Sequence, residues 1–333
     1  KEEVLRLIDE QGKLTEELST AIQAATVLQR VEDLYRPYKQ KRRTKATIAK
    51  ERGLEPLADE LMKFPKVDIA QIASKYINTE KGVESVEDAL AGARDILAER
   101  FADDASIRDQ LRKLSRREGK IMTTVKNAEK DEKQVFEMYY EYEEPVNRIV
   151  PHRILAINRG EKEDVLRVSI TVPVERAVQM MESKWIPKNF TSGAIAHIKE
   201  AIADSYKRLI EPSIEREIRA ELTEKAEAQA IHIFSENLRN LLLQPPIRGK
   251  MVLGVDPAYR TGCKLAVVDE TGKMLEVTAI YPHPPKPDVA KSKAIVKSLL
   301  NKYPISIIAI GNGTASRETE QFIADTLKEI END

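Results

Sequence analysis

One stretch of the chain, 251–269, limits the possible folds more than any other; it reads MVLGVDPAYRTGCKLAVVD. A short apolar run at its start ends in Asp256, and a turn containing proline and glycine follows. Apolar residues then alternate with others over Cys263–Val268, as in a strand with one buried face. A second short turn leads into a third run, Met274–Tyr281. The pattern predicts three consecutive antiparallel strands.

Helical and strand patterns alternate after these three runs. Asp288–Lys302 has helical spacing, Ile305–Ile310 reads as a strand, and a further helix is predicted from about Thr314 to Ile330. Three antiparallel strands that lead into a β-α-β unit, with an acid closing the first and central strand, resemble the beginning of the RNase H-like fold. We therefore expect an α/β domain of this kind over residues 251–333.

Residues 1–245 are predicted to be mainly helical, with turns and two short strands between the helices. The strands are predicted at Ile121–Val125 and Val165–Val172, and a helix that Gly160 would end is predicted between them. One stripe at helical spacing predicts a helix up to about Arg36; it comprises Leu18, Ile22, Ala25, Leu28 and Val31.

The longest helix is predicted to begin where Glu211-Pro212-Ser213 restarts the chain. Its apolar positions recur at helical spacing; they are Ile214, Ile218, Leu222, Ala226, Ile231, Phe234, Leu238 and Leu241. Pro245-Pro246 then forms a stiff break, which we interpret as the domain boundary. The predicted organisation is a helical module over 1–245 and an α/β domain over 251–333.

Composition indicates a globular chain of about two domains, because 333 residues of which 41% are apolar can form more than one core. No run approaches the roughly 18 apolar residues that a membrane span needs, so we expect no membrane contact. The one cysteine, Cys263, suits a reducing compartment, and we expect a cytoplasmic protein. The chain starts at Lys1 inside a helical pattern, which suggests a fragment of a longer protein.

A run of ten residues, 36–45, contains six basic side chains and no acidic one. These candidates for phosphate contact are Arg36, Lys39, Lys41, Arg42, Arg43 and Lys45. Tyr35 and Tyr38 are interleaved with them and could stack on bases. The alternative is a solvated loop that pairs with the many acidic helices or packs on another domain. The formal net charge of −1 excludes neither interpretation, because it hides this local asymmetry.

Hydrolysis of a phosphodiester by two metal ions needs several converging carboxylates. Asp256 could supply one, but the strand Ile305–Ile310 is followed by Gly311-Asn312-Gly313, which brings no charge. Asp269 and Glu270 are expected at the far end of the second strand. We therefore predict no catalytic residue, no metal and no cofactor. Asp256 is then a vestigial acid, whose carboxylate would accept hydrogen bonds from the turn that follows it.

Four segments together resemble the bacterial Tex family of transcription accessory proteins: RVEDLYRPYKQKRRTKATIAKERGLEPLA (30–58), PHRILAINRGEKEDVLRV (151–168), LGVDPAYRTGCKLAVVD (253–269) and AIGNGTASRET (309–319). The resemblance implies a helical N-terminal region with a helix-turn-helix-like portion and a YqgF-type domain of RNase H-like fold. It also implies that this domain stops at Asp333 before its last strand and helix. Helix-hairpin-helix and OB-fold RNA-binding parts would follow in the family. Ala258 stands where the family usually has glycine.

We therefore predict a non-catalytic transcription accessory factor that binds RNA, DNA or both and contacts the transcription machinery. Arg260 and Arg317, beside the YqgF-like site, are a second set of candidate contacts. Two alternatives stay open: a metal-dependent nuclease or junction resolvase of RNase H-like fold, and a protein-interaction scaffold for the transcription machinery. The sequence does not decide the preferred nucleic acid or the oligomeric state.

Overall fold

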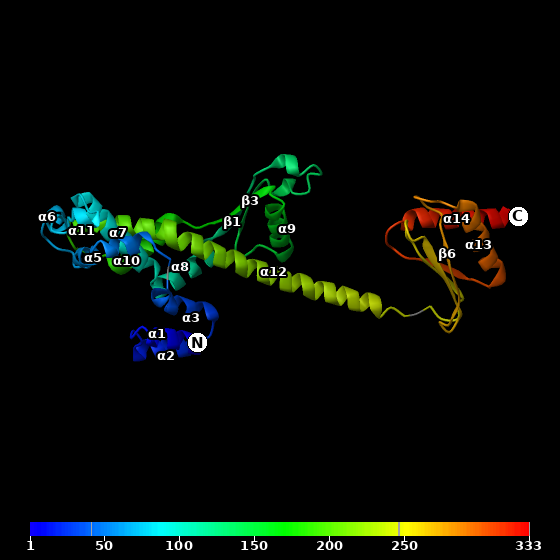
Figure 1. Ribbon diagram of the computed structural model, residues 1–333, viewed down its shortest axis with the longest axis horizontal. Coiled ribbons are helices and arrows are strands. Elements are labelled where there is room, and N and C mark those ends of the chain that lie inside the picture. Colours follow the sequence, from blue (N-terminus) through cyan, green and yellow to red (C-terminus); the bar gives the residue numbers. More distant parts are fainter. Residues whose placement is uncertain (41, 246, 333) are drawn as a thin grey trace. The chain divides into compact units, whose positions relative to one another are not determined.

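The computed structural model describes residues 1–40, 42–245 and 247–332, and the chain divides into two compact units, Lys1–Glu236 and Asn237–Asp333 (Figure 1). The first, which we call the helical unit, is mainly α-helical. The second, which we call the α/β unit, contains a mixed sheet. This agrees with the predicted fold class. In the described part of the chain, no helix is long and apolar enough to cross a membrane.

Three short helices form the N-terminus: α1 (Glu2–Asp9), α2 (Glu16–Ala24) and α3 (Leu28–Tyr35). The single helical stripe predicted here is wrong, because Ala25 is extended and Leu28 is 73% exposed. The three helices instead enclose a small core of their own, formed by Ile8, Ile22, Ala25 and Val31.

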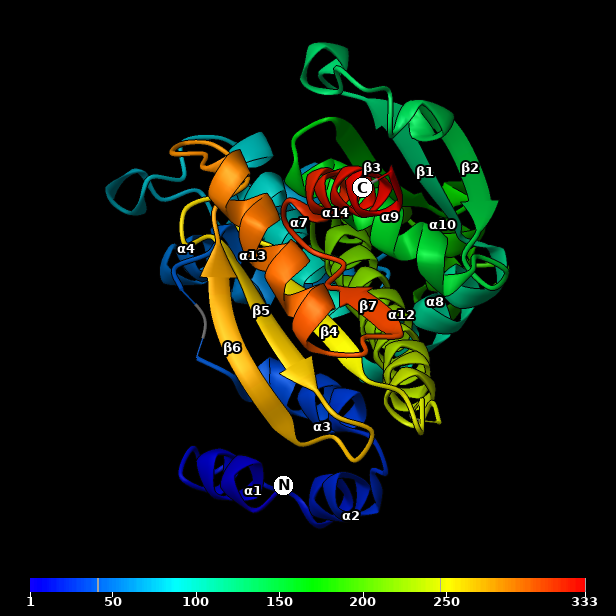
Figure 2. The same cartoon turned by 90° about the vertical axis from the view of Figure 1, so that its right-hand side faces the viewer.

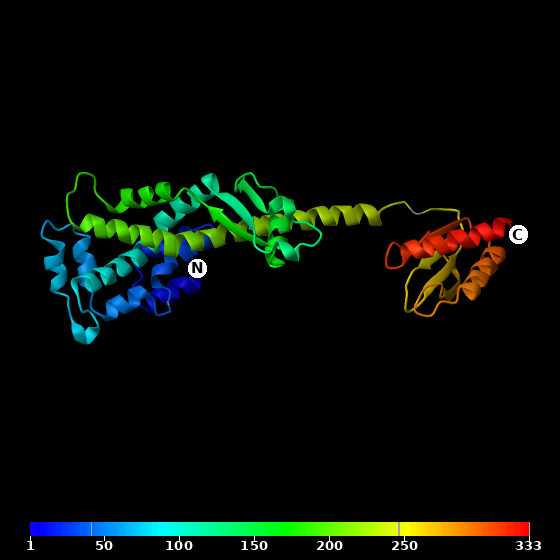
Figure 3. The ribbon, with the colours of Figure 1, turned by 90° about the horizontal axis from the view of Figure 1, so that it is seen from above.

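The body of the helical unit is built around α7 (Val86–Ala102), which many other helices contact (Figure 3). The apolar side chains Leu90, Ala93, Leu97 and Phe101 of α7 are buried, as their spacing predicts. The remaining α-helices of the body are α4 (Lys45–Glu51), α5 (Glu55–Leu61), α6 (Ile69–Ser74), α8 (Ala105–Glu118), α10 (Val174–Trp185) and α11 (Ala194–Asp204).

A three-stranded antiparallel sheet forms a side lobe, in the order β2 (Glu141–Pro145), β1 (Lys120–Val125), β3 (Leu166–Thr171). Helix α9 (Pro151–Lys162) packs on β3. Gly160 does not end this helix as predicted. It lies inside α9, where a Cβ would stand 2.6 Å from the Leu166 Cδ1 atom, so the absence of a side chain lets helix and strand approach.

The predicted restart at Glu211 is also wrong, because the chain continues as one helical rod from α11 into α12 (Glu211–Leu242). The turns between them, Ser205–Ile210, are π-helical. Pro212 lacks an N–H and its ring crowds the carbonyl four residues earlier, so a wider turn before it allows the helix to continue. Beyond Ala226 the apolar side chains of α12 are exposed; they include Ile231, Phe234, Leu238 and Leu241.

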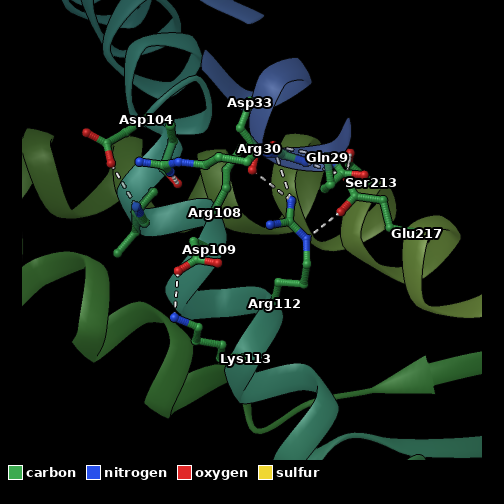
Figure 4. A network of polar contacts seen from close by, with 12 residues as sticks. Gln29, Arg30, Asp33, Asp104, Arg108, Asp109, Arg112, Lys113, Ser213 and Glu217 are labelled. Atoms are coloured by element: carbon green, nitrogen blue, oxygen red, sulfur yellow. Dashed lines mark hydrogen bonds and ion pairs between the residues drawn. The ribbon is translucent and has the colours of Figure 1, made fainter. Parts of the chain in front are cut away.

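Four charged side chains are packed together where α3, α8 and α12 meet (Figure 4). Arg108 and Arg112 of α8 lie between Asp33 of α3 and Glu217 of α12, and we call these four residues the buried ion cluster. Arg112 donates to Asp33 Oδ1 (3.2 Å) and to Glu217 Oε2 (2.9 Å), and Arg108 donates to Glu217 Oε1 (2.9 Å). Arg108 Nε is 3.4 Å from Asp33 Oδ1. The cluster therefore fixes α3 on the body.

The α/β unit has a four-stranded sheet in the order β6-β5-β4-β7, which Figure 2 shows side by side. Its strands are β4 (Val252–Asp256), β5 (Cys263–Val268), β6 (Met274–Ile280) and β7 (Ile307–Ile310). The first three are antiparallel, β7 is parallel to β4, and β4 is central, as predicted. Helices α13 (Val289–Lys302) and α14 (Ser316–Asn332) contribute Val296, Leu299, Phe322 and Ile323 to the core on one face of the sheet.

Candidate nucleic-acid interface

The basic run begins directly after α3 and ends at the start of α4. Arg36 opens one 3-10 turn, Arg36–Tyr38. At the other end, Thr44 caps α4 by accepting a hydrogen bond from the Thr47 N–H (3.1 Å). The loop between these two points is therefore held at both ends by ordered helices. Lys41, one of the six predicted contacts, lies outside the described residues.

Two arginines of the run are already paired within the chain. The Arg36 guanidinium lies 3.3 Å from Asp103 at the end of α7, and its side chain is only 35% exposed. Arg43 donates to Glu51 at the end of α4 (2.8 Å). A phosphate would have to compete with these carboxylates, so Arg36 has mainly a packing role in this structure.

The other basic side chains of the run that the structure describes face solvent. Lys39, Arg42 and Lys45 are all exposed. The side chains of Lys39 and Arg42 make no hydrogen bond or ion pair with any residue that the structure describes. They are therefore the members of the run that a phosphate could contact without displacing an acid.

Tyr35 and Tyr38, which the sequence suggested as base-stacking residues, are half-buried. Both rings pack against the small core of α1, α2 and α3. The Tyr38 carbonyl also accepts a hydrogen bond from the Gln11 side chain (2.8 Å). The structure thus gives both rings a packing role between the N-terminal helices and the basic run.

A second group of predicted residues lies at the carboxyl end of β4 and β7. Asp256 closes β4, and the Gly311 N–H after β7 donates to the Val255 carbonyl (2.8 Å). A Cβ at position 311 would stand 3.3 Å from Pro257, so the loop after β7 packs closely on the turn after β4. The Asp256 carboxylate itself is exposed.

Asp256 does not have the predicted structural role, because the turn that follows it sends no hydrogen bond to its carboxylate within the described part of the chain. The turn is attached to α14 instead, since the Tyr259 hydroxyl donates to Glu318 Oε1 (3.0 Å). This hydrogen bond raises the pKa of Tyr259. Ala258, which stands where the family usually has glycine, has no positive φ; in this turn Gly262 has one (φ 75°).

His283 and Thr319 form a buried polar contact behind this turn. The His283 Nε2 atom is 2.8 Å from the Thr319 hydroxyl, and the Cys263 sulfur is 3.6 Å from the same hydroxyl. Burial lowers the pKa of His283. Sequence reasoning missed this contact, because residues 36 positions apart carry no local signal of their proximity.

The acids that the structure describes in the α/β unit do not converge on a metal site. Asp269 lies at the opposite end of the sheet, where Val252 pairs with Val268, and it accepts hydrogen bonds from the N–H groups of Thr271 (2.8 Å) and Lys273 (3.0 Å). Within residues 1–40, 42–245 and 247–332, no group of three or more His, Cys, Asp or Glu could hold a metal ion.

Arg260 and Arg317 lie at the same end of the sheet as Asp256. Arg260 adjoins Tyr259 and Arg317 adjoins Glu318, so the bond between Tyr259 and Glu318 brings both arginines to the same end of the sheet. Both side chains are exposed, and neither makes an ion pair with a described residue. They form a second, separate candidate for anion contact.

Comparison with known proteins places both units in one family. The Tex central region-like family matches residues 65–234, and the Tex protein YqgF-like domain matches residues 250–333. The chain is 56% identical over 332 residues to the uncharacterized protein YdcI of Bacillus subtilis (strain 168), covering 99% of this chain and 46% of that protein.

Two relatives carry the family name. The protein tex of Bordetella pertussis is 37% identical, with 97% of this chain and 42% of that protein covered. The transcriptional accessory protein Tex of Neisseria gonorrhoeae is 38% identical, with 98% and 43% covered. The chain thus spans less than half the length of the relatives that it matches. Since the central-region match covers residues 65–234 and the YqgF-like match covers the remainder from residue 250, the chain belongs to the Tex family.

Proposed function

We propose that this chain is a nucleic-acid-contacting part of a non-catalytic transcription accessory factor. The observation that carries the proposal is the pair Lys39 and Arg42, two exposed cations without an acidic partner among the described residues. They lie between α3 and α4, two ordered helices that fix the ends of this stretch. The name of one relative, the transcriptional accessory protein Tex of Neisseria gonorrhoeae, supports the same role.

The non-catalytic part of the proposal rests on the residues at the end of the sheet where β4 and β7 finish, in the α/β unit. Asp256 is exposed, the nearby Glu318 is bound to the Tyr259 hydroxyl (3.0 Å), and Asn312 stands where a second acid would be needed. Two divalent ions about 4 Å apart need several negatively charged ligands between them. The Asp256 carboxylate alone does not supply this charge. We therefore assign this end of the sheet, with Arg260 and Arg317, to anion contact.

A salt titration tests the proposal. Binding of a labelled single-stranded RNA and of a labelled DNA duplex is measured by fluorescence anisotropy between low and moderate salt. The double variant Lys39→Gln/Arg42→Gln removes two phosphate contacts, so the slope of log K against log salt becomes shallower by about 1.4 for RNA or about 1.8 for duplex DNA. Lys133→Gln/Lys162→Gln, which removes two exposed lysines of the side lobe, keeps the original slope.

The paired arginines favour one alternative, a protein-interaction scaffold. Arg36 and Arg43 already bind carboxylates of this chain, at 3.3 Å and 2.8 Å, and the same run could bind an acidic protein surface. The titration separates the two functions. Absence of measurable binding to RNA and DNA at low salt overturns the nucleic-acid proposal and leaves the scaffold.

We also propose 1–245 and 251–333 as the functional division of the chain. Helix α12 ends at Leu242 and β4 begins at Val252, which supports a linker between these points. The transcription machinery is the proposed partner, and the cytoplasm is the proposed compartment.

A further inference from the structure

A second basic group consists of Arg52, which directly follows helix α4 after the basic run, and Lys81; the sequence did not suggest it. Arg52 begins the turn between α4 and α5, and Lys81 lies in a tight hairpin in which Asn78 and Val83 pair. The two turns face one another. The Lys81 ammonium stands 3.7 Å from where a Cβ on Gly53 would be, and the Arg52 guanidinium stands 3.7–3.8 Å from that of Gly82.

Each cation therefore lies over the glycine of the other turn. Gly53 and Gly82 both have a positive φ, 82° and 74°, and a side chain at either would meet the opposing cation. Each glycine is followed directly by a fully buried residue, Leu54 or Val83. The two turns are thus anchored in the core of the helical unit, and each carries a cation that reaches the backbone of the other turn.

No acid compensates this pair within the described chain. Neither Arg52 nor Lys81 makes an ion pair there, and neither pairs with the neighbouring exposed Glu80. Glu51, next to Arg52, is bound to Arg43 at 2.8 Å. That ion pair also brings Arg43 of the basic run to the end of α4, next to Arg52.

Two neighbouring unpaired cations repel one another, and an anion placed between them removes that repulsion. Arginine presents planar N–H donors that match a phosphate, and lysine adds a point charge. We propose that Arg52 and Lys81 form a phosphate clamp, a site that binds the sugar–phosphate backbone of a nucleic acid next to Lys39 and Arg42. This inference rests on the proposed function and extends its interface to a second pair of turns.

The test compares three double variants of the whole chain in the same anisotropy titration. Arg52→Gln/Lys81→Gln removes the clamp, Lys39→Gln/Arg42→Gln removes the loop cations, and Lys133→Gln/Lys162→Gln is the control of equal charge change. The clamp variant is expected to make the salt slope shallower by about 1.4 for single-stranded RNA or about 1.8 for duplex DNA. The loss should be the same for unrelated base sequences, because phosphate contacts do not read bases.

The outcomes separate the clamp from the function on which it rests. If the loop variant changes the slope and the clamp variant behaves as the control, the clamp is wrong and the proposed function stands. If the wild-type chain binds neither RNA nor DNA at low salt, both are wrong.

A measurement on the wild-type chain covers the case in which the clamp variant does not fold. Lysines are acetylated with and without saturating RNA or DNA, and the modified positions are read by mass spectrometry. Lys81 should be protected by the nucleic acid at least several-fold, whereas Lys133 should not. Equal modification of Lys81 in the two samples overturns the clamp.

Discussion

Asp33 in the helical unit and Asp256 in the α/β unit show two opposite uses of the same side chain. Asp33 is 2% exposed and lies within 3.4 Å of Arg108 and 3.2 Å of Arg112. Asp256 is exposed and has no ion pair with a described residue. The buried charges of the described chain, Asp33, Arg108, Arg112 and Asp131, all lie in the helical unit. A buried carboxylate with partners joins helices, whereas a single exposed one is left without a structural role.

The basic residues of the run 36–45 also differ in whether an acid of the same chain pairs with them. Arg36 is paired with Asp103 and Arg43 with Glu51, so carboxylates of the same chain partly neutralise these two arginines. Lys39 and Arg42 have no such partner among the described residues. A run of basic letters is therefore not a uniform binding surface, and the absence of an internal partner is the property that marks a residue for an external phosphate.

The largest expected effect tests the buried side of this comparison. Asp33→Ala leaves Arg108 and Arg112 with one carboxylate, that of Glu217, and should lower the free energy of unfolding of the helical unit by about 3–5 kcal/mol. Urea unfolding followed by the fluorescence of Trp185, which packs on Phe101, measures this change. Glu32→Ala, on the same helix but exposed, is the matched control and should stay within about 0.5 kcal/mol of wild type. An equal shift in both variants would contradict the role of the cluster.

The α/β unit should depend on apolar burial instead. Leu265→Ala on β5, where the side chain is 1% exposed, is expected to destabilise this unit by about 2–5 kcal/mol. Cys263, the one cysteine of the chain, is fully buried, so its rate of reaction with a thiol reagent reports opening of the unit. Val277→Ala on β6, 57% exposed, should leave that rate nearly unchanged. If Cys263 reacts as slowly in Leu265→Ala as in the wild-type chain, the stability of this unit does not depend on its apolar core.

Local patterns predicted much of this fold. The β4, β5 and β6 strands and the central place of β4 follow from apolar runs between turns. Strand β2 was missed because Glu141-Tyr142-Glu143-Glu144-Pro145 offers no apolar alternation. Gly160 was misread as a helix end because its close contact with Leu166 exists only in the folded chain.

The candidate site was predictable only as a list of basic residues. Which of them is free depends on acids far along the chain, since Asp103 is 67 positions from Arg36. Arg52 and Lys81 become neighbours only because two turns pack together. Such pairings arise from tertiary packing, which the spacing of residues in one sequence does not determine.

The pH dependence should differ between the two units. Burial lowers the pKa of His283 below its ordinary 6.5, so the unfolded α/β unit binds a proton that the folded unit resists. Its stability is therefore complete above about pH 6.5 and falls as the pH falls below that value. Burial alone would raise the pKa of Glu217, but its hydrogen bonds with Arg112 and the charge of Arg108 outweigh burial and lower it. The helical unit should therefore lose stability only below about pH 4.5.

Two reporters can follow this difference in one sample. The reactive thiolate becomes scarcer as the pH falls, so the reaction rate of Cys263 is divided by that of a free thiol at the same pH. This ratio should begin to rise at a higher pH than the one at which the Trp185 fluorescence reports unfolding. His283→Gln should abolish the rise between pH 6.5 and 5 and leave the Trp185 profile unchanged. Coincident profiles for the two reporters in the wild-type chain would contradict the assignment to His283.

The smallest expected effect concerns Asp256. Asp256→Asn should change the stability of the α/β unit by less than about 0.5 kcal/mol, because the carboxylate is exposed and unpartnered within the described chain. Its effect on nucleic-acid affinity should also be slight, and slightly favourable, since one negative charge is removed beside Arg260 and Arg317. Titration with Mn²⁺ should show no saturable binding in either protein, because one carboxylate does not hold two divalent ions. Cleavage of a branched DNA by the wild-type chain with Mg²⁺ or Mn²⁺, lost in Asp256→Asn, would reverse the comparison and make this exposed aspartate the functional one.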